Sequence, residues 1–366
     1  MKDSKINILY LWTEMNYCCG VSQHIWMLST NMKNNNHRVV IAANGGTMRK
    51  EIQDTGISFE NIPFTSDNLS ITQILNTYWK IIQIIKKYNI HIVHSHHRWL
   101  ELIVHLTKPF HSSFGIMTCH NLLLGKRAIS YKSKKIIAVS DAVRRHLNEY
   151  FGIDNEKIIT IRNAPREFEK IDKARIIQYK SDLGVSEKNL VIGGFGRLHK
   201  EKGFDILLEA LIIASSNGYH IDCVIAGDGP ERENLEKIAT ENKLRIRFLG
   251  EVQNLSLCYE LCDIIVIPSR KDAAPLIALE AASFTKPIIA SSVGGLKEIV
   301  TNRINGLTFE FEQSQQLYEA IVEYLLNEEL RNQCAENLNA LLIESYSIDK
   351  MVAKTEFVYK EVLCLC

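Results

Sequence analysis

A repeated alternation of two kinds of segment constrains the fold of this sequence more than any other feature. Short runs rich in Ile and Val, bounded by polar or turn residues, are typical of buried parallel strands. Amphipathic stretches lie between them, such as ITQILNTYWKIIQIIKKYN (71–89), with apolar residues at helical spacing. Repeated strand–helix units predict an α/β fold with a doubly wound parallel sheet. In the first half the strand-like runs span residues 6–12, 37–44, 91–96, 114–120, 134–140 and 158–163.

The alternation pauses once, and the pause divides the chain. Residues 164–189 are polar and charged, which favours an interdomain connection. We therefore expect two doubly wound, Rossmann-like domains, 1–167 and 168–345, facing each other across a cleft, followed by a helical tail, 346–366. Ligands in such sheets bind beyond the carboxyl ends of the strands. After the pause the strand-like runs span residues 190–198, 221–229, 246–252, 263–269, 286–295 and 306–311.

Composition is that of a globular protein with a full core, with 46% hydrophobic and 23% charged residues. No apolar run approaches the roughly 18 residues of a transmembrane helix. The first strand-like run is too short for a signal peptide. The nine cysteines lack zinc-ligand spacing and predict reduced thiols. Together these features predict a cytoplasmic protein.

The net charge of +1 conceals an uneven distribution. Residues 1–167 hold 21 Lys and Arg against 12 Asp and Glu, a balance of +9, whereas the rest holds 22 against 30, a balance of −8. A basic half can meet an anionic membrane surface or an acidic acceptor. The alternative is that these charges are simply exposed to solvent and serve no partner, which explains the uneven distribution equally well. No dense basic block with interleaved aromatics is present, which argues against nucleic acid.

The stretch GGFGRLHKEKGFD (193–205) follows a predicted strand and is rich in glycine. A dinucleotide fingerprint needs a third glycine, and none follows Gly196 at the required spacing, so a nicotinamide site is not supported. Glycines at a strand end let the backbone approach a phosphate. Arg197 and Lys202 would then neutralise a diphosphate without a metal. The alternative interpretation is a tight turn with two solvated cations.

A second stretch, PSRKDAAPLIALEAAS (268–283), places two carboxylates at a predicted loop–helix junction. Asp272, at the mouth of the cleft, suits sugar hydroxyls, and Glu280, inside the first helical turns, suits a ribose. The helix N–H groups between them suit a phosphate. The alternative is that Asp272 caps the helix and Glu280 lies on its solvated face.

Taken in order, these stretches resemble the retaining nucleotide-sugar glycosyltransferases of family 4, which have the GT-B fold. The resemblance is strong over residues 190–310 and weaker in the first half, and it implies that the tail packs back on the N-terminal domain. The motifs that carry it are CGVSQHIWMLSTNM, HIVHSHH, TCHN, KKIIAVSDAVRRHL, TIRNAP, GGFGRLHKEKGFDILLEA, CVIAGDGPERENLE, FLGEV, PSRKDAAPLIALEAASFTKPIIASSVGGLKEIV and NGLTF.

The resemblance implies a role for each matching residue. Arg197 and Lys202 would bind the donor diphosphate and stabilise the leaving nucleoside diphosphate. Asp272 replaces the first glutamate of the family's E-x7-E motif, which contacts the donor sugar, and Glu280 would hold the ribose hydroxyls. His120 matches a histidine near the transferred sugar. Further donor-binding positions are Gly20 in the first loop, Gly196, Gly250 and Val252 along the base, and Ala274, Pro275 and Leu276 in the second loop.

The sequence departs from the family at three points that bear on the donor sugar. Asp272 is one methylene shorter than glutamate. The usual E-G-F-G reads D-A-A-P, and Pro275 removes a backbone donor. Cys19 replaces the first of the paired glycines in the first loop.

No D-x-D motif is present, so we expect no metal and no other cofactor. His94 and His96 share a strand face and His97 follows, but no cysteine or carboxylate completes a metal site, and packed or cleft-lining histidines are expected. His24 and His199 are expected near the phosphate.

The predicted reaction moves a sugar from a nucleoside-diphosphate sugar, UDP-sugar first, to an acceptor hydroxyl. A sugar-nucleotide epimerase and a non-catalytic partner subunit are the alternatives. The acceptor, a saccharide or lipid-linked saccharide in surface polysaccharide synthesis, is expected to bind the basic first half. LLLGKRAISYKSKK (122–135) and the helix at 71–89 are candidates for peripheral membrane contact, although the helix reads equally as a core helix.

Overall fold

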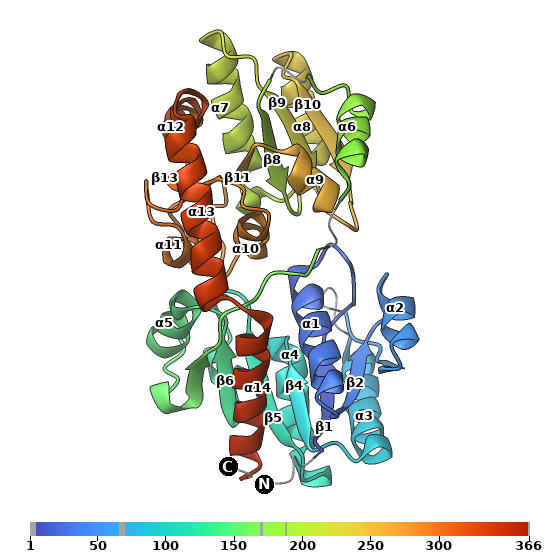
Figure 1. The fold of residues 1–366 in the computed structure, drawn as a ribbon. Coiled ribbons are helices and arrows are strands. Elements are labelled where there is room, and N and C mark those ends of the chain that lie inside the picture. Colours follow the sequence, from blue (N-terminus) through green and yellow to red (C-terminus); the bar gives the residue numbers. More distant parts are fainter. Residues whose placement is uncertain (1–4, 66–69, 169–170, 187–188, 365–366) are drawn as a thin grey trace. The chain divides into compact units, whose positions relative to one another are not determined.

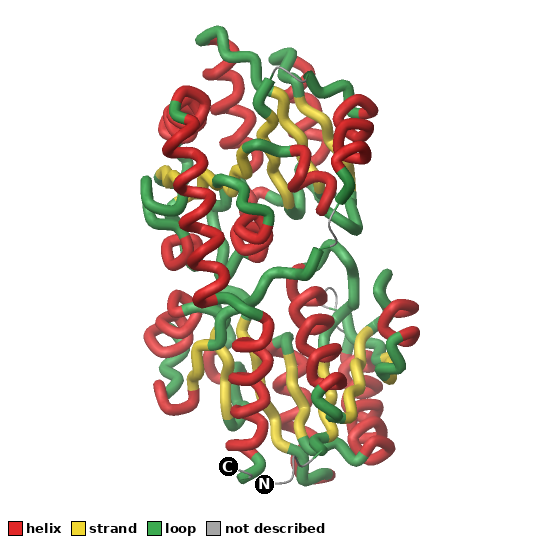
Figure 2. Tube along the Cα trace, in the orientation of Figure 1, coloured by secondary structure: helices red, strands yellow, loops and turns green. Residues whose placement is uncertain are grey.

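The computed structural model describes residues 5–65, 70–168, 171–186 and 189–364, and it divides into two compact units. Unit 1 comprises residues 1–164 with 348–366, and unit 2 comprises residues 165–347. Each unit is a parallel sheet with helices (Figures 1 and 2). No described helix has the length and apolar character needed to cross a membrane.

Unit 1 contains a seven-stranded sheet in the order β3-β2-β1-β4-β5-β6-β7, and its strand pairs are parallel. Sequential order breaks between β1 and β4, which is the switch point where ligands collect in such sheets. The strands are β1 Asn7–Leu11, β2 Arg38–Ala43, β3 Ser58–Asn61, β4 Ile92–Ser95, β5 Phe114–Cys119, β6 Lys135–Ala138 and β7 Ile158–Thr160. The helices are α1 Gly20–Asn34, α2 Arg49–Asp54, α3 Ile71–Tyr88, α4 Arg98–Thr107, α5 Asp141–Glu149 and α14 Ile348–Val362, with short 3₁₀ turns including η1 Lys108–Phe110.

Alternate side chains of β1 supply two separate cores on the two faces of this sheet. Ile8 and Tyr10 join the core that contains α1 and α14. Leu9 and Leu11 join the core that contains α3 and α4. The C-terminal helix α14 is therefore an integral layer of unit 1. Its Tyr359 hydroxyl lies 3.1 Å from that of Tyr10.

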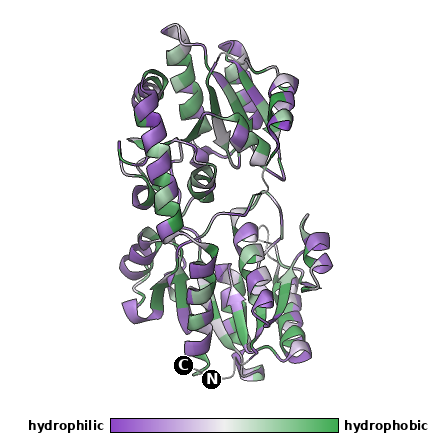
Figure 3. Ribbon diagram, viewed as in Figure 1, coloured by the Kyte–Doolittle hydropathy of each residue, from purple (hydrophilic) through white to green (hydrophobic). Residues whose placement is uncertain are grey.

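Unit 2 contains a six-stranded sheet in the order β10-β9-β8-β11-β12-β13, again with parallel pairs and a switch point between β8 and β11. Apolar stretches of its strands are green in Figure 3. The strands are β8 Val191–Phe195, β9 Asp222–Ala226, β10 Ile246–Gly250, β11 Ile264–Ile267, β12 Ile288–Ser291 and β13 Leu307–Phe309. The helices are α6 Lys173–Asp182, α7 Phe204–Ser216, α8 Arg232–Glu241, α9 Ser256–Leu261, α10 Leu276–Ser283, α11 Leu296–Ile299, α12 Ser314–Leu326 and α13 Glu328–Ser345.

Three details differ from the expectation. β3 was not predicted, because its sequence SFEN at the sheet edge is polar and only half-buried. The predicted connection at 164–189 contains the helix α6, which begins after a cap in which the Asp172 side chain accepts from the Ala174 N–H. The boundary lies after Ala164, so Arg166 belongs to unit 2 rather than to the first domain.

Candidate functional site

In unit 2 the loops that follow β8, β9 and β11 converge at the carboxyl edge of the sheet. Two glycines make this convergence possible, because each has a positive φ and almost touches a neighbouring backbone. A Cβ on Gly227 would lie 1.9 Å from the carbonyl oxygen of Gly196, and one on Gly203 would lie 2.0 Å from that of Pro268. No side chain fits at such distances. The glycines at the strand ends therefore allow the backbones of neighbouring loops to pack directly against each other.

The loops after β8 and β11 bring two predicted site residues into direct contact. The Lys202 ammonium donates to the Asp272 carboxylate at 2.6 Å. The Lys202 side chain is 35% exposed and that of Asp272 is 10% exposed. A paired lysine and carboxylate at the carboxyl edge present both a phosphate-binding cation and an acceptor for sugar hydroxyls.

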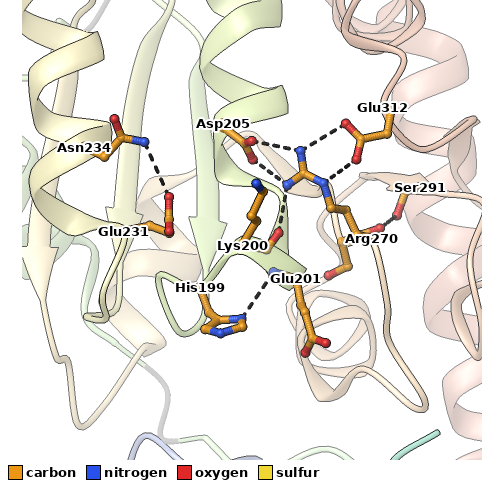
Figure 4. Close-up of polar contacts among 10 residues, drawn as sticks. His199, Lys200, Glu201, Asp205, Glu231, Asn234, Arg270, Ser291 and Glu312 are labelled. Carbon is orange, nitrogen blue, oxygen red and sulfur yellow. Dashed lines mark hydrogen bonds and ion pairs between the residues drawn. The ribbon is translucent and has the colours of Figure 1, made fainter. Parts of the chain in front are cut away.

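Arg270 holds these two loops together, and the sequence reading missed it. Its guanidinium donates to both carboxylate oxygens of Asp205 at 2.7 and 2.8 Å, and to the Lys200 carbonyl at 2.8 Å. It also donates to Glu312 at 3.1 Å, as Figure 4 shows. The His199 ring caps the short 3₁₀ turn by accepting from the Glu201 N–H at 3.3 Å. These contacts fix the backbone that carries Arg197 and Lys202.

Arg197 itself has a different environment from the other cations of the loop. It is exposed, and its side chain makes no hydrogen bond or ion pair with the residues that the structure describes. A planar guanidinium in this state keeps all its donors for an anion. The structure therefore leaves Arg197 available beside a lysine that is already paired.

The helix α10 begins close to Asp272 and has an open N-terminus. Pro275 occupies the N-cap position and supplies no side-chain cap, so the first N–H groups, from Leu276 onward, have no capping partner. The Gly295 N–H donates to the Asp272 carbonyl at 2.9 Å and fixes the preceding loop, including Ala274. Because the helix starts at Leu276, Asp272 is not its cap, and that alternative is wrong.

Glu280 is buried within α10 and is fully engaged by other side chains. Arg166 donates to its two oxygens at 2.6 and 3.1 Å, and the Tyr259 hydroxyl donates at 2.8 Å. The residue is 1% exposed, so the alternative that it lies on a solvated helix face is also wrong. A buried carboxylate requires a cation and hydrogen bonds of this kind. A ribose would have to share or displace one of these donors.

Gly250 is the last residue of β10, the strand beside β9, and Val252 lies two residues beyond it. The Gly227 N–H donates to the Gly250 carbonyl at 2.7 Å, and Gly250 has φ +70°. Val252 is half-buried against the core of unit 2. This segment reaches the same edge of the sheet as Gly196.

In unit 1 the predicted residues Gly20 and His120 lie on neighbouring elements. Gly20 begins α1, and His24 follows one turn later. His120 follows β5, and its Nε2 lies 2.9 Å from Nδ1 of His96, which follows β4. The rings of His24 and His120 are 4.9 Å apart in an edge-to-face arrangement. Three histidines from separate elements thus meet at the carboxyl edge.

Burial keeps these imidazoles neutral. Desolvation lowers the pKa of His24 to about 4, although the Asn163 side chain acts in the opposite direction. Desolvation also lowers the pKa of His96 and of His120 well below the usual value, and neighbouring histidines add to the effect. Neutral imidazoles accept and donate hydrogen bonds, which suits sugar hydroxyls.

The same three histidines are the described group that could hold a metal. Their nearest ring nitrogens lie within 4.8 Å of one another. His96 and His120, however, already use one nitrogen each on their mutual hydrogen bond. His94, considered from the sequence, turns instead to Tyr359 and Thr118 at 2.6 Å each. His97 packs edge-on against Trp12 and Phe64.

Comparison with known families decides what this arrangement is. Residues 176–341 match the family described as Glycosyl transferases group 1, and residues 19–164 match Glycosyltransferase Family 4. The chain belongs to the family 4 glycosyltransferases. An uncharacterized glycosyltransferase of Methanocaldococcus jannaschii is 27% identical over 360 residues, which cover 94% of this chain and 95% of that protein.

Solved structures show that this glycosyltransferase has the GT-B fold. A glycosyltransferase from Rickettsia africae has a TM-score of 0.84 with 24% identity, covering 98% of this chain and 99% of that one. The Anabaena protein HepE, solved in complex with UDP-glucose, has a TM-score of 0.85 with 19% identity, covering 99% and 100%. The two parallel sheets and the helical C-terminal tail confirm the predicted fold class.

Sequence reasoning about the glycosyltransferase missed Arg166 and Tyr259 as well as Arg270. Arg166 lies in the polar connection at 164–189, which contains several cations, and no sequence pattern distinguishes Arg166 from the others. The stretch IALEAAS offered an indirect signal, because Glu280 is its single charge and four of its neighbours are buried. A carboxylate in such a helix needs a cationic partner from elsewhere in the chain.

Proposed function

We propose that the protein transfers a sugar from a nucleoside-diphosphate sugar, specifically a UDP-sugar, to an acceptor hydroxyl with retention of the anomeric configuration. The observation that carries the proposal is the contact between Lys202 and Asp272. The same loops carry Arg197, whose side chain has no partner among the described residues, and the start of α10, which has no side-chain cap. Phosphate-binding and sugar-binding groups therefore meet at one edge of unit 2. The choice of UDP is supported by the HepE complex with UDP-glucose.

In the proposed reaction the bond between the anomeric carbon and the donor phosphate oxygen breaks as the acceptor oxygen attacks from the same face. The departing phosphate oxygen takes the proton of the acceptor hydroxyl, so no side chain is needed as a general base. Arg197, Lys202 and the N–H groups at the start of α10 would stabilise the charge that develops on the diphosphate. In unit 2, Asp272 would orient sugar hydroxyls and Glu280 would orient the ribose. In unit 1, His120 would offer a neutral imidazole to a sugar hydroxyl.

We further propose that the reaction is hexosyl transfer and needs no metal. Two cations and a helix N-terminus supply the positive charge that a divalent ion supplies elsewhere. Metal independence can be tested directly, because the histidine cluster of unit 1 is the place where zinc would bind. Transfer should persist in EDTA, and metal analysis of the purified protein should find no stoichiometric zinc.

The acceptor we propose is a saccharide or a lipid-linked saccharide used in surface polysaccharide or glycoconjugate synthesis, in the cytoplasm or at the inner face of a membrane. Support comes from the uneven charge, since the basic residues concentrate in the half expected to bind the acceptor.

The first test is a thermal-shift screen against UDP, GDP, ADP, CMP and NAD in the presence of EDTA. Stabilisation by UDP alone supports the donor assignment. Arg197→Ala should then reduce turnover with the corresponding UDP-sugar by about 10²-fold or more, because a preorganised donor to developing charge is lost. Arg303→Ala, at an exposed ion pair in the same unit, is the matched control.

Two outcomes would reject this proposal in different ways. Normal turnover by the Arg197→Ala variant would overturn the diphosphate assignment. Nucleotide binding without transfer to any acceptor would indicate a non-catalytic partner subunit, and release of free UDP with an epimerised sugar would indicate an epimerase.

A further inference from the structure

A row of large apolar side chains is exposed along α3. Ile71, Leu75 and Trp79 recur every four residues, so they lie on one side of the helix. They are 77%, 53% and 55% exposed. From Ile71 to Trp79 the row extends about 12 Å along the helix axis. The core positions of α3, such as Ile81 and Ile85, lie on a different side of the helix, so burial within unit 1 does not explain this row.

Two more exposed apolar residues extend the row onto the neighbouring segment. Leu106 of α4 is 54% exposed and Phe110 of η1 is 46% exposed. The Phe110 ring lies 6.2 Å from those of Trp79 and Tyr78. We call this set, Ile71, Leu75, Trp79, Leu106 and Phe110, the α3–α4 face. Clustered aromatic and aliphatic groups on one surface indicate an interaction site.

The segment of the sequence that contains the α3–α4 face is strongly basic, although its Lys134 and Lys135 contact α14. Residues 70–140 contain ten Lys or Arg and one acidic residue, Glu101, a balance of +9 that equals the whole excess of residues 1–167. Glu101 is buried and is satisfied by Tyr131 and Ser133. Glu60, a described carboxylate of unit 1, pairs with Lys87 at 2.7 Å. Lys86 comes seven residues after Trp79 and lies on the same side of α3 as the apolar row, whereas the Lys108 ammonium lies 4.9 Å over the Phe114 ring.

We propose that the α3–α4 face docks on a lipid bilayer that contains anionic lipids. Exposed Trp, Phe and Leu flanked by lysines match the chemistry of a bilayer interface, where rings insert and ammonium groups meet phosphates. A second copy of the chain would bring the same positive charges together. An acidic protein would meet the lysines but leave no reason for five large apolar groups.

The orientation of α3 would place the docked membrane next to the edge of the sheet that carries His120. A crossover helix runs antiparallel to its strands, so Ile71 at the start of α3 lies toward the carboxyl edge of the sheet, where His120 follows β5. At this edge the loop after β5 exposes Leu124, and Lys126 lies 4.0 Å over the Trp99 ring. A membrane on this face would border the edge that carries His120. A membrane in this position implies that the acceptor is an amphiphile. That inference rests on the proposed function, whereas the docking itself does not.

The test is co-flotation with vesicles of phosphatidylcholine, with and without phosphatidylglycerol. The wild-type protein should float only with the anionic vesicles, and added salt should release it. The Lys86→Gln variant should bind about fivefold more weakly. Leu75→Ser should also weaken binding. Leu326→Ser and Lys237→Glu, both exposed in unit 2, should not.

Tryptophan emission supplies a second readout. Trp79 is the most exposed of the four tryptophans, so its insertion should shift the emission to shorter wavelength, and Trp79→Phe should bind yet lose most of the shift. Stabilisation by UDP, measured on every variant, separates this proposal from the donor assignment. Absence of binding to anionic vesicles would overturn the proposal. So would binding that survives both α3–α4 variants, or dimerisation that Leu75→Ser abolishes without any vesicle binding.

Discussion

The ion pair between Arg166 and Glu280 allows a quantitative prediction. The Arg166 side chain is 15% exposed and that of Glu280 is 2% exposed, and the two form a bidentate contact within unit 2. Replacing Arg166 with Ala leaves a buried carboxylate with the Tyr259 hydroxyl as its one remaining described donor. Removing one partner of a buried pair costs about 3–5 kcal/mol because the other charge is left uncompensated.

The remaining Tyr259 hydrogen bond and the slight exposure of Arg166 place Arg166→Ala at the low end, about 3 kcal/mol. At about 2–4 °C per kcal/mol for a unit of this size, the melting temperature of unit 2 should fall by about 6–12 °C. Glu280→Gln in the Arg166→Ala background should recover part of the loss, because the amide oxygen still accepts from Tyr259 and no charge remains buried.

The assay exploits the positions of the tryptophans, which all lie in unit 1 at residues 12, 26, 79 and 99. Tryptophan fluorescence follows unfolding of unit 1, whereas far-UV circular dichroism follows both units. Arg166→Ala should move the dichroism transition and leave the fluorescence transition in place. Arg303→Ala, at an exposed pair, should change neither by more than about 1 kcal/mol. A loss below 1 kcal/mol in Arg166→Ala, or no recovery in the double variant, would refute the reasoning.

Three further predictions concern both units. Because burial holds the pKa of His24 at about 4, against about 6.5 when unfolded, unit 1 should lose about 3 kcal/mol through this group alone as the pH falls from 6.5 to 4, so acid should change tryptophan fluorescence before unit 2 unfolds. Tyr359→Phe removes the hydroxyl that is hydrogen-bonded to the buried His94, so the free energy of unfolding of unit 1 in urea should fall by about 1–3 kcal/mol. Phe357→Ala, at an exposed position of α14, should change that free energy little. Lys202→Ala should abolish most of the thermal stabilisation by UDP; unchanged stabilisation would contradict the diphosphate role.

The strands that sequence reasoning located are those with continuous apolar runs, because burial on both faces demands them. IIVI of β11 is such a run, and each of its residues is buried. β3 carries no such run, because it lies at the edge of the sheet and pairs with one neighbour. An edge strand needs no apolar residues on its open side, so its sequence does not differ from that of a loop.

The site was predictable to the level of loops but not of contacts. Lys202 and Asp272 were each placed after a strand, yet their contact depends on β8 and β11 being neighbours, which follows from the sheet order. The meeting of His24, His96 and His120 depends likewise on β1, β4 and β5 being adjacent. Alternation in a sequence locates the buried strands, but the order in which they pair is a tertiary property.

The charges of unit 2 are arranged so that binding a donor must exchange existing partners. Lys202 is held by Asp272 and Glu280 by Arg166, so both carboxylates are neutralised before any substrate arrives. In the proposed reaction a diphosphate that draws Lys202 away leaves Asp272 without its cation. Sugar hydroxyls can then replace the lost hydrogen bonds, which UDP alone cannot do. In that proposal the exchange would favour the complete donor over the released nucleotide, and the Asp272 carboxylate would be the group that distinguishes one donor sugar from another.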